Sequence, residues 1–250
     1  MKFGIIGYGN LGKAFASALL CTGKVSAQDI SVYDNSDTAL SAARNESFDT
    51  YNVDEINALI KSADIICIIV KGYVFEELAE KIDKTALKDK LVISMMAGES
   101  FDKIYSLIGH VNLARAMPSI AIATNEGVMA YTKVPENVSA IFDQFGFAFE
   151  TEPENIERVM AFAACGLAYA AYLIDAFAAA GESMGFSPEV TSQIAALTFK
   201  NASGTGNFKE TIKSVATPGG ATEQGINHMN KSGVYNIVTE AVKKAYERMT

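Results

Sequence analysis

The chain has 250 residues, of which 49% are hydrophobic and 20% charged, and its formal net charge at pH 7 is -8. This length is enough for two domains of ordinary size, and the composition is typical of a globular protein rather than a disordered one. Its scattered lysines and net negative charge argue against a general nucleic-acid binder, which presents a clustered basic face to the phosphates.

The cysteines and the apolar segments predict a cytoplasmic protein without membrane contact. Cys21, Cys67 and Cys165 lie far apart in apolar surroundings, which favours buried thiols in a reducing compartment over a disulfide framework or a metal site. The first residues lack the unbroken apolar stretch of a signal peptide. The most apolar run, Val159–Ile174, is shorter than the roughly 18 to 20 residues needed to cross a bilayer, so we expect a buried helix there.

Up to residue 152, short apolar runs alternate with amphipathic helical stretches, as in strand-helix-strand units. Two of the runs, Asp64–Val70 and Leu91–Ala97, are almost continuously apolar, which is typical of strands covered by helices on both faces. We therefore predict an α/β domain over residues 1–152 with a doubly wound, mostly parallel sheet. Its predicted strands are Lys2–Ile6, Ile30–Tyr33, Asp64–Val70, Leu91–Ala97, Asn112–Met117, Gly127–Thr132 and Phe147–Glu150.

From Pro153 onward the pattern becomes helical, and residues 153–250 are predicted to form an all-helical domain. Gly185, followed by Ser187 and Pro188, marks the end of one helix and the start of the next. The run Val159–Ile174 is too hydrophobic all round for a helix that faces water, which predicts a dimer formed through it. Four further helices are expected at Ser187–Ala202, Phe208–Val215, Ala221–Asn230 and Val234–Met249.

Three glycines, Gly7, Gly9 and Gly12, stand between the first predicted strand and the first helix. In such a turn the first glycine makes the tight bend, the second lets the backbone approach a pyrophosphate, and the third lets the helix pack on the strand. The pattern G-x-G-x-x-G also occurs by chance in loops, but here its strand-turn-helix context fits throughout. We predict a dinucleotide site that includes Asn10 and Leu11, with its phosphates at the helix N-terminus.

Asp34 follows the second predicted strand, where a carboxylate accepts hydrogen bonds from the adenosine ribose and repels a 2′-phosphate. This position favours NADH. Asn35 and Ser36 come next, and such small polar residues can bind a phosphate, so both NADH and NADPH are retained as cofactors. The alternative is that Asp34 simply forms a turn after the strand.

Further cofactor contacts are predicted at the carboxyl ends of later strands, which together form the crevice of a doubly wound sheet. The alternative for each residue is a loop position shaped only by turn chemistry. The residues are Val70, Lys71, Ala97, Gly98, Met117 and Pro118.

A second anion site is predicted in the helical half, where a Pro-Gly-Gly turn precedes a helix. The hydroxyls of Thr217 and Thr222, with the N–H groups around Gly220 and Ala221, are predicted to hold a substrate carboxylate at that helix N-terminus. The predicted substrate site is Thr217, Gly219, Gly220 and Thr222. The alternative is ordinary N-capping by a threonine.

The segment Ser214–Asn230, "SVATPGGATEQGINHMN", resembles the signature of the pyrroline-5-carboxylate reductases. Similarity extends over most of the chain through "GYGNLGKA", "VKG", "AGES" and "RAMPS". The resemblance implies a Rossmann-type domain that binds NADPH or NADH, a helical dimerisation domain, and a cyclic imine carboxylate bound against the Pro-Gly-Gly turn. It also implies reduction of 1-pyrroline-5-carboxylate to L-proline, for which Thr222 is a candidate proton relay.

Two departures from the family pattern leave other functions open. Ser119, Ile120 and Ala121 replace the usual Asn-Thr-Pro after Met-Pro, and Ala163–Tyr169 keeps only the end of the usual Ser-Gly-Ser-x-Pro-Ala-Tyr. One alternative is a paralogue that reduces a different cyclic imine or small carboxylate substrate. The other is a non-catalytic dinucleotide-binding sensor. The two histidines, His110 and His228, lack metal-ligand spacing.

Overall fold

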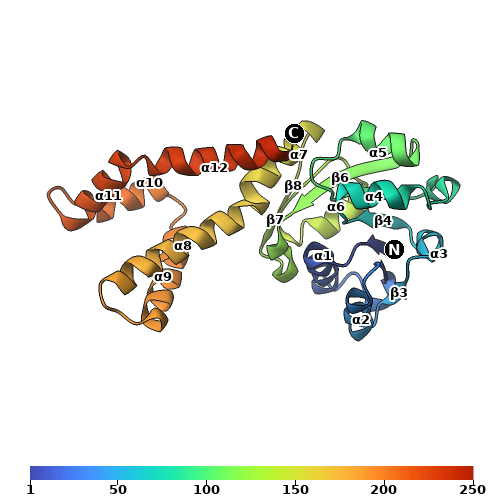
Figure 1. Cartoon of the computed structure of the whole chain (residues 1–250), viewed down its shortest axis with the longest axis horizontal. Coiled ribbons are helices and arrows are strands. Elements are labelled where there is room, and N and C mark those ends of the chain that lie inside the picture. The colour runs from blue at the N-terminus through green and yellow to red at the C-terminus, as the bar shows by residue number, and fades with distance from the viewer. Residues whose placement is uncertain (250) are drawn as a thin grey trace. The chain divides into compact units, whose positions relative to one another are not determined.

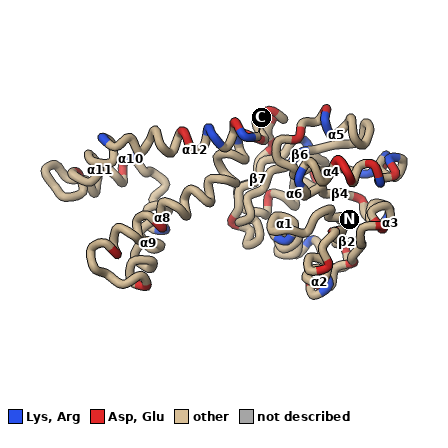
Figure 2. The backbone as a smooth tube through the Cα atoms, in the orientation of Figure 1, with Lys and Arg blue, Asp and Glu red and all other residues tan. Residues whose placement is uncertain are grey.

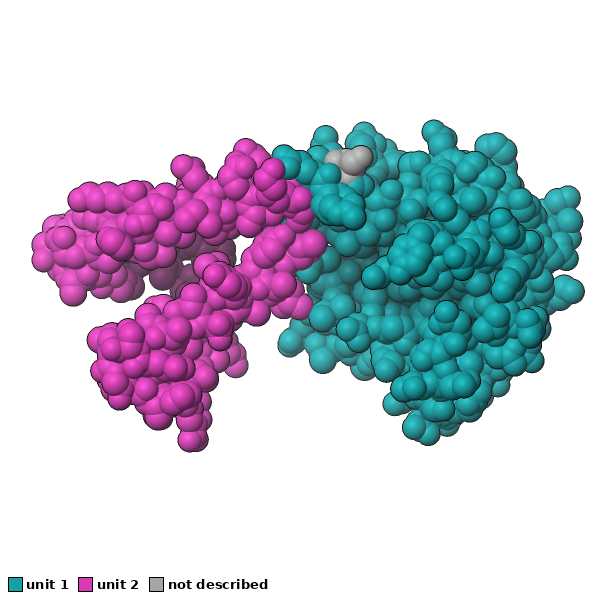
Figure 3. All heavy atoms as spheres, in the orientation of Figure 1, with its two compact units in different colours: residues 1–164, 246–250 teal, residues 165–245 magenta. Residues whose placement is uncertain are grey.

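The computed structural model describes residues 1–249, which divide into two compact units (Figure 3). Unit 1 comprises Met1–Ala164 together with the chain from Tyr246 onward, and unit 2 comprises Cys165–Ala245. The residues from Pro153 to Ala164 thus pack with the sheet. A functional boundary between residues 152 and 153 stays a prediction.

Unit 1 is built on an eight-stranded sheet in the order β3-β2-β1-β4-β5-β6-β7-β8 (Figure 1). All neighbouring strands are parallel except β6 and β7, which confirms the predicted doubly wound, mostly parallel sheet. Every predicted strand is present, whereas β3 has no predicted counterpart because it is only three residues long. The bounds are β1 Phe3–Ile6, β2 Ile30–Tyr33, β3 Asp49–Tyr51, β4 Ile65–Ile68, β5 Leu91–Ser94, β6 Asn112–Pro118, β7 Gly127–Tyr131 and β8 Gly146–Glu150.

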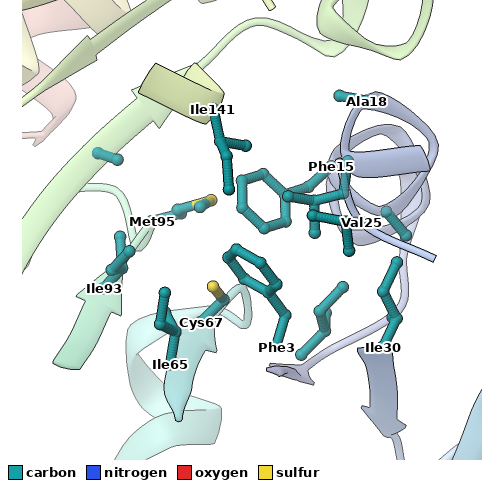
Figure 4. Close-up of a cluster of buried hydrophobic side chains, with 14 of the residues drawn as sticks. Phe3, Phe15, Ala18, Val25, Ile30, Ile65, Cys67, Ile93, Met95 and Ile141 are labelled. Atoms are coloured by element: carbon teal, nitrogen blue, oxygen red, sulfur yellow. The ribbon is translucent and has the colours of Figure 1, made fainter. Parts of the chain in front are cut away.

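Helices cover both faces of this sheet, because successive strand residues point to opposite sides. In β4, Ile65 and Cys67 enter the core cluster that contains Phe15 of α1, whereas Ile66 and Ile68 enter a second cluster. Figure 4 shows side chains of the first cluster meeting between the strands and α1. The helices of unit 1 are α1 Asn10–Cys21, α2 Asp37–Asn45, α3 Ile56–Ser62, α4 Gly72–Ala79, α5 Phe101–Ile108, α6 Glu136–Phe142 and α7 Ile156–Val159.

Unit 2 is helical, as predicted, and the four helices expected after Gly185 all form within one or two residues of their predicted bounds. A π-helical turn, Met160–Ala164, connects α7 to α8. The last helix, α12, begins in unit 2 and ends in unit 1. The bounds are α8 Gly166–Ser183, α9 Pro188–Ser203, α10 Phe208–Val215, α11 Ala221–Lys231 and α12 Val234–Met249.

The expectation that Val159–Ile174 is buried is wrong for the single chain. Helical residues Pro153–Ser183 form a run that, by length and composition alone, is apolar enough to cross a membrane, and only 6% of its most apolar window is buried. Tyr172 and Phe162 are each 73% exposed. Figure 2 shows few charged residues along α8. The hydrophobicity of the segment is as the sequence indicates, but burial also needs a covering surface, and the described residues of one chain do not supply it.

The expectation of buried cysteines holds for Cys67 alone. Cys67 lies in the sheet, and its burial raises the pKa of the thiol. Cys21 is exposed because it ends α1 at the surface, and its thiol lies 3.8 Å from the carbonyl oxygen of Ala123. Cys165 is partly exposed.

Candidate functional site

The three glycines of the first turn have three different surroundings. Gly7 has φ +100°, and a Cβ there would lie 2.5 Å from the carbonyl oxygen of Ile69. A Cβ on Gly12 would overlap the carbonyl oxygen of Gly7, so only glycine lets α1 pack so closely on the turn. At Gly9, by contrast, a Cβ would have no described atom within 4 Å, because the backbone there borders open space. This open space is what a pyrophosphate approach requires.

The N-terminus of α1 is available to an anion. Its N-cap is Gly9, and within residues 1–249 no side chain caps the helix and no acidic residue lies in its first turn. Unpaired N–H groups and the positive end of the helix dipole therefore face the space beside Gly9.

Asp34 holds the glycine turn and also shapes its own loop. Its Oδ2 accepts a hydrogen bond from the N–H of Tyr8 at 2.7 Å, and its Oδ1 accepts one from the N–H of Ser36 at 2.8 Å. Ser36 then caps α2 by accepting from the N–H of Ala39 at 3.3 Å. Through these contacts Asp34 has a structural role, as in the alternative that it forms a turn after the strand. Each carboxylate oxygen has a second acceptor position, so the ribose contact stays a prediction.

Tyr8, between the first two glycines, anchors the turn to the core. Its side chain is 4% exposed and meets the ring of Phe48 edge-on, with centroids 6.1 Å apart. Burial, with a smaller contribution from the nearby carboxylate of Glu46, raises the pKa of the Tyr8 hydroxyl to about 12. The phenol thus stays neutral.

The strand order brings the predicted cofactor residues to one edge of unit 1. The order reverses between β1 and β4, and ligands of doubly wound sheets bind at such a point, beyond the carboxyl ends of the strands. The N–H of Ile69 donates to the carbonyl of Ile6 at 2.8 Å, and that of Met95 donates to Ile68 at 2.9 Å. The glycine turn and the segments after β2, β4, β5 and β6 therefore share this edge. The residues concerned are Gly7, Gly9, Asn10, Leu11, Gly12, Asp34, Asn35, Ser36, Val70, Lys71, Ala97, Gly98, Met117 and Pro118.

Two glycines at this edge are explained by contacts that sequence reasoning missed. Gly98 has φ +70°, and a Cβ there would lie 2.8 Å from the carbonyl oxygen of Met249 at the end of α12. A Cβ on Gly72 would overlap the carboxylate of Glu99. Gly72 and Glu99 stand 27 positions apart in the sequence, so no local pattern relates them.

Ser119 and Ile120, which follow Met117 and Pro118, differ in exposure and in polarity. Ser119 is 5% exposed, its Oγ accepts from the N–H of Val128 at 3.1 Å, and its own N–H donates to the carbonyl of Val128 at 2.8 Å. Its hydroxyl is thus bound to β7. Ile120 is 51% exposed and presents an apolar side chain in its place.

In unit 2, Thr217, Gly219 and Gly220 lie in the turn before α11, and Thr222 lies in the first turn of that helix. The N-cap of α11 is Gly220, and no side chain in the described part of the chain caps it, so the alternative of threonine capping is wrong. Both glycine N–H groups already have acceptors: Gly219 donates to Oε2 of Glu223 at 2.8 Å, and Gly220 donates to the carbonyl of Thr217 at 2.9 Å. The side chains of Thr217 and Thr222 are exposed.

Glu223 is the residue at this turn that sequence reasoning passed over. Its signal was its position in the first turn of α11, from which a glutamate reaches back to a preceding N–H.

The two histidines are exposed, and His110 stacks on Tyr105 with ring centroids 4.7 Å apart. Within residues 1–249, no group of three or more His, Cys, Asp or Glu is arranged to hold a metal ion.

Comparison with known proteins shows which family the sequence of this chain resembles. Residues 153–250 match the family model of pyrroline-5-carboxylate reductase dimerisation, and residues 2–98 match that of the coenzyme F420-dependent NADP oxidoreductases. The pyrroline-5-carboxylate reductases of Aquifex aeolicus and Escherichia coli are each 28% identical over 263 residues, which cover 99% of this chain and 96% of theirs. The chain is thus similar to the pyrroline-5-carboxylate reductases over nearly its whole length. The resemblance seen in the sequence is confirmed.

Solved structures show the same fold over the whole chain. The Plasmodium falciparum pyrroline carboxylate reductase with NADP bound is 24% identical, with a TM-score of 0.89 and coverage of 100% of this chain and 97% of that one. The Streptococcus pyogenes 1-pyrroline-5-carboxylate reductase is 23% identical, with a TM-score of 0.86 and coverage of 100% and 98%. The chain thus has a Rossmann fold followed by a helical domain, and the two family models match these parts as an NADP oxidoreductase domain and a dimerisation domain.

Proposed function

We propose that the protein reduces 1-pyrroline-5-carboxylate to L-proline with a nicotinamide cofactor. The observation that carries this proposal is the joint presence of an open glycine turn in unit 1 and the Pro-Gly-Gly turn before α11 in unit 2, within a chain that matches the reductases over nearly its whole length. The cofactor is NADPH or NADH, because residues 2–98 match a family of NADP oxidoreductases and the Plasmodium structure holds NADP.

The residues of the first turn fit such a cofactor. The space beside Gly9, which a larger side chain would fill, and the uncapped N-terminus of α1 suit a pyrophosphate. In this proposal Asp34, directly after β2, accepts hydrogen bonds from the adenosine ribose, and the exposed Asn35 and Ser36 beside it lie at the same loop. Lys71 and Ala97, beyond β4 and β5, border the same edge.

The reaction needs few catalytic side chains, because reduction of a protonated cyclic imine requires mainly correct placement of the imine carbon against the nicotinamide. The bound nicotinamide supplies a hydride to the imine carbon. In this chain the hydroxyls of Thr217 and Thr222 donate to the substrate carboxylate, while Gly219 and Gly220 shape the turn that carries them. After hydride transfer to the protonated imine the ring nitrogen is a neutral amine, and the Thr222 hydroxyl is the candidate relay for the proton that this amine then takes up from solvent. Glu223, by holding the Gly219 N–H, keeps this turn closed.

We expect a homodimer or a higher homo-oligomer, since residues 153–250 match a dimerisation model and α8 exposes an apolar surface. We also expect a cytoplasmic protein that contacts neither membranes nor nucleic acid.

The test is the substitution Thr222→Ala. Loss of a hydroxyl that donates to a buried charged group costs about 1.5 to 3 kcal/mol, so the KM for pyrroline-5-carboxylate should rise on the order of tenfold or more. NADH affinity and the melting temperature should be unchanged, because Thr222 does not cap α11. The matched control is Thr205→Ala, an exposed threonine in the same unit whose hydroxyl donates to Ala202 at 2.9 Å. Unchanged KM in Thr222→Ala would refute the assignment of the turn to the substrate.

One observation favours a second candidate, the reduction of a different cyclic imine or small carboxylate substrate. Ser119 has its hydroxyl bound to Val128, and Ile120 adds an exposed apolar side chain beside it. These features suit a substrate with more apolar surface. NADH oxidation measured over a panel of cyclic imines and 2-keto acids decides between the substrates. A protein that binds NADH but oxidises it with none of them is a dinucleotide-binding sensor.

A further inference from the structure

Arg115, in the middle of β6, makes a buried bridge that the proposed reaction does not use directly. Its side chain is 3% exposed, and its Nη1 donates to Oε1 of Glu157 on α7 at 2.6 Å. Its Nη2 donates to the backbone carbonyl of Met96 at 2.7 Å. One guanidinium thus joins the segment after β5 to the start of the dimerisation region.

The carbonyl that Arg115 holds is directly before a cofactor segment. Met96 precedes Ala97 and Gly98, and the parallel ladder between β5 and β6 ends at the pair Ser94 and Arg115. Beyond that pair the register between β5 and β6 ends, and the N–H of Met95 still donates to the carbonyl of Ile68 on β4 at 2.9 Å. The hydrogen bond from Arg115 to Met96 is the next restraint on the loop that leads to Gly98. We call Met96–Gly98 the β5 loop.

The β5 loop also receives the end of α12, since Gly98 lies against the carbonyl of Met249. Beside the bridge is a cavity of about 500 Å3 lined by residues that include Gly98, Asp102, Arg115, Glu157 and Met249. Within residues 1–249, Nε of Arg115 has no hydrogen-bond partner. One flank of the bridge borders this cavity. Met96 is itself buried in the second core cluster, and the guanidinium adds to that packing a directed restraint on its carbonyl.

Stability alone does not account for such a bridge. A buried ion pair gains little over well-packed apolar side chains of similar volume, because both charges lose their hydration. What the planar guanidinium adds is geometry, since its fork reaches two acceptors in fixed directions, which a lysine ammonium does less well.

We propose that Arg115 is a positioning residue for the cofactor: its guanidinium fixes the β5 loop in the conformation that binds the nicotinamide dinucleotide, and Glu157 fixes the guanidinium. The inference rests on the proposed function, because it takes the β5 loop as part of the cofactor site. Arg115 acts through the backbone of Met96 and does not itself touch the substrate.

The decisive variant is the double substitution Arg115→Met with Glu157→Met, which removes both charges and keeps apolar volume in their place. We expect its melting temperature to remain close to that of the parent protein. Its dissociation constant for NADH, measured by calorimetry, should rise about tenfold, as expected for the loss of one ordering hydrogen bond to a charged group. A stable double variant that binds NADH like the parent would overturn the proposal and leave Arg115 a structural residue.

Arg115→Lys gives a second measurement if the double variant does not fold. Lysine keeps the positive charge beside Glu157 but lacks the second nitrogen that donates to the carbonyl of Met96. NADH affinity should therefore fall while the melting temperature is retained. Parent-like NADH affinity in Arg115→Lys would likewise overturn the proposal. Calorimetry with NADH needs no imine, so a parent protein that binds NADH but reduces no imine refutes the proposed reaction without affecting this test.

Discussion

The two units of the chain differ in how much of their apolar surface they bury. In unit 1, β1, β2, β4 and β5 are buried along their whole length, and apolar clusters fill both faces of the sheet. In unit 2, all of whose residues the structure describes, only Ala178, Thr191 and Ala195 are buried. Large apolar side chains such as Tyr172, Leu197 and Tyr235 are 59% to 73% exposed.

Unit 1 therefore has a hydrophobic core of its own, whereas the apolar side chains of unit 2 lack a covering surface among the described residues of one chain. Burial of apolar area is the main favourable contribution to folding, and contiguous exposed apolar surface of this kind marks an interaction face. Unit 2 lies wholly within the match to the dimerisation model. We therefore expect variants in unit 2 to act first on assembly, and variants in unit 1 to act on cofactor binding or on the stability of the sheet.

The largest expected effect follows from placing a charge on α8. Tyr172→Glu puts a carboxylate on a helix face that we expect to be covered in the assembly, which costs several kcal/mol when the charge is left unpaired. The variant should be monomeric by light scattering and inactive, while still binding NADH through unit 1. The matched control is Val53→Glu, an exposed apolar residue of unit 1 at 37% exposure, which should leave the oligomer intact. A fully assembled Tyr172→Glu variant would contradict the comparison.

A smaller effect, on cofactor affinity at one position and on stability at the other, is expected at Gly9 and Gly12 of the first turn. Gly9→Val fills the open space beside α1, so NADH affinity should fall by about 100-fold or more while the melting temperature is retained. Gly12→Val instead drives a side chain into the carbonyl of Gly7 and should unfold unit 1 at a lower temperature by several degrees. Calorimetric titration and thermal melting of both variants separate the two roles. Equal effects on stability would show that the turn has no ligand-facing side.

A moderate effect is expected where Gly72 meets Glu99. Gly72→Ala places a methyl group against the Glu99 carboxylate, which must move at a cost of about 1 kcal/mol or more. The melting temperature should fall by a few degrees. Adding Glu99→Val should restore it, because the shorter side chain leaves room for the methyl group. Additive losses in the double variant would mean that the two positions do not interact.

The smallest expected effect is on cofactor choice. Asp34→Ala removes a negative charge near the expected position of the 2′-phosphate, so the ratio of NADH to NADPH affinity should shift toward NADPH by about a few fold, as for a partly solvated charge. Some loss of stability should accompany it, since Asp34 also accepts from the N–H groups of Tyr8 and Ser36. An unchanged ratio with lowered stability would assign Asp34 to the turn alone.

Local patterns in the sequence were sufficient for the elements and for the glycine turn. Continuous apolar runs predicted β4 and β5, and Gly185 before Pro188 predicted the break between α8 and α9. Gly7, Gly9 and Gly12 could be assigned different roles because each role depends on neighbouring residues in one strand-turn-helix unit. The short strand β3 lacked any such pattern.

Contacts between residues far apart in the sequence became known only from the folded chain. Arg115 reaches Met96 and Glu157, and Gly98 meets Met249, through contacts between residues that no local spacing relates. The sequence by itself showed that α8 is apolar, but hydrophobicity is a property of the side chains, whereas burial depends on the surface that lies opposite. In the same way the sequence identified the Pro-Gly-Gly turn, while the fold decided that Glu223 occupies the N–H of Gly219. Local conformation follows from local residues, and the use of each donor, charge and apolar face follows from what folding brings beside it.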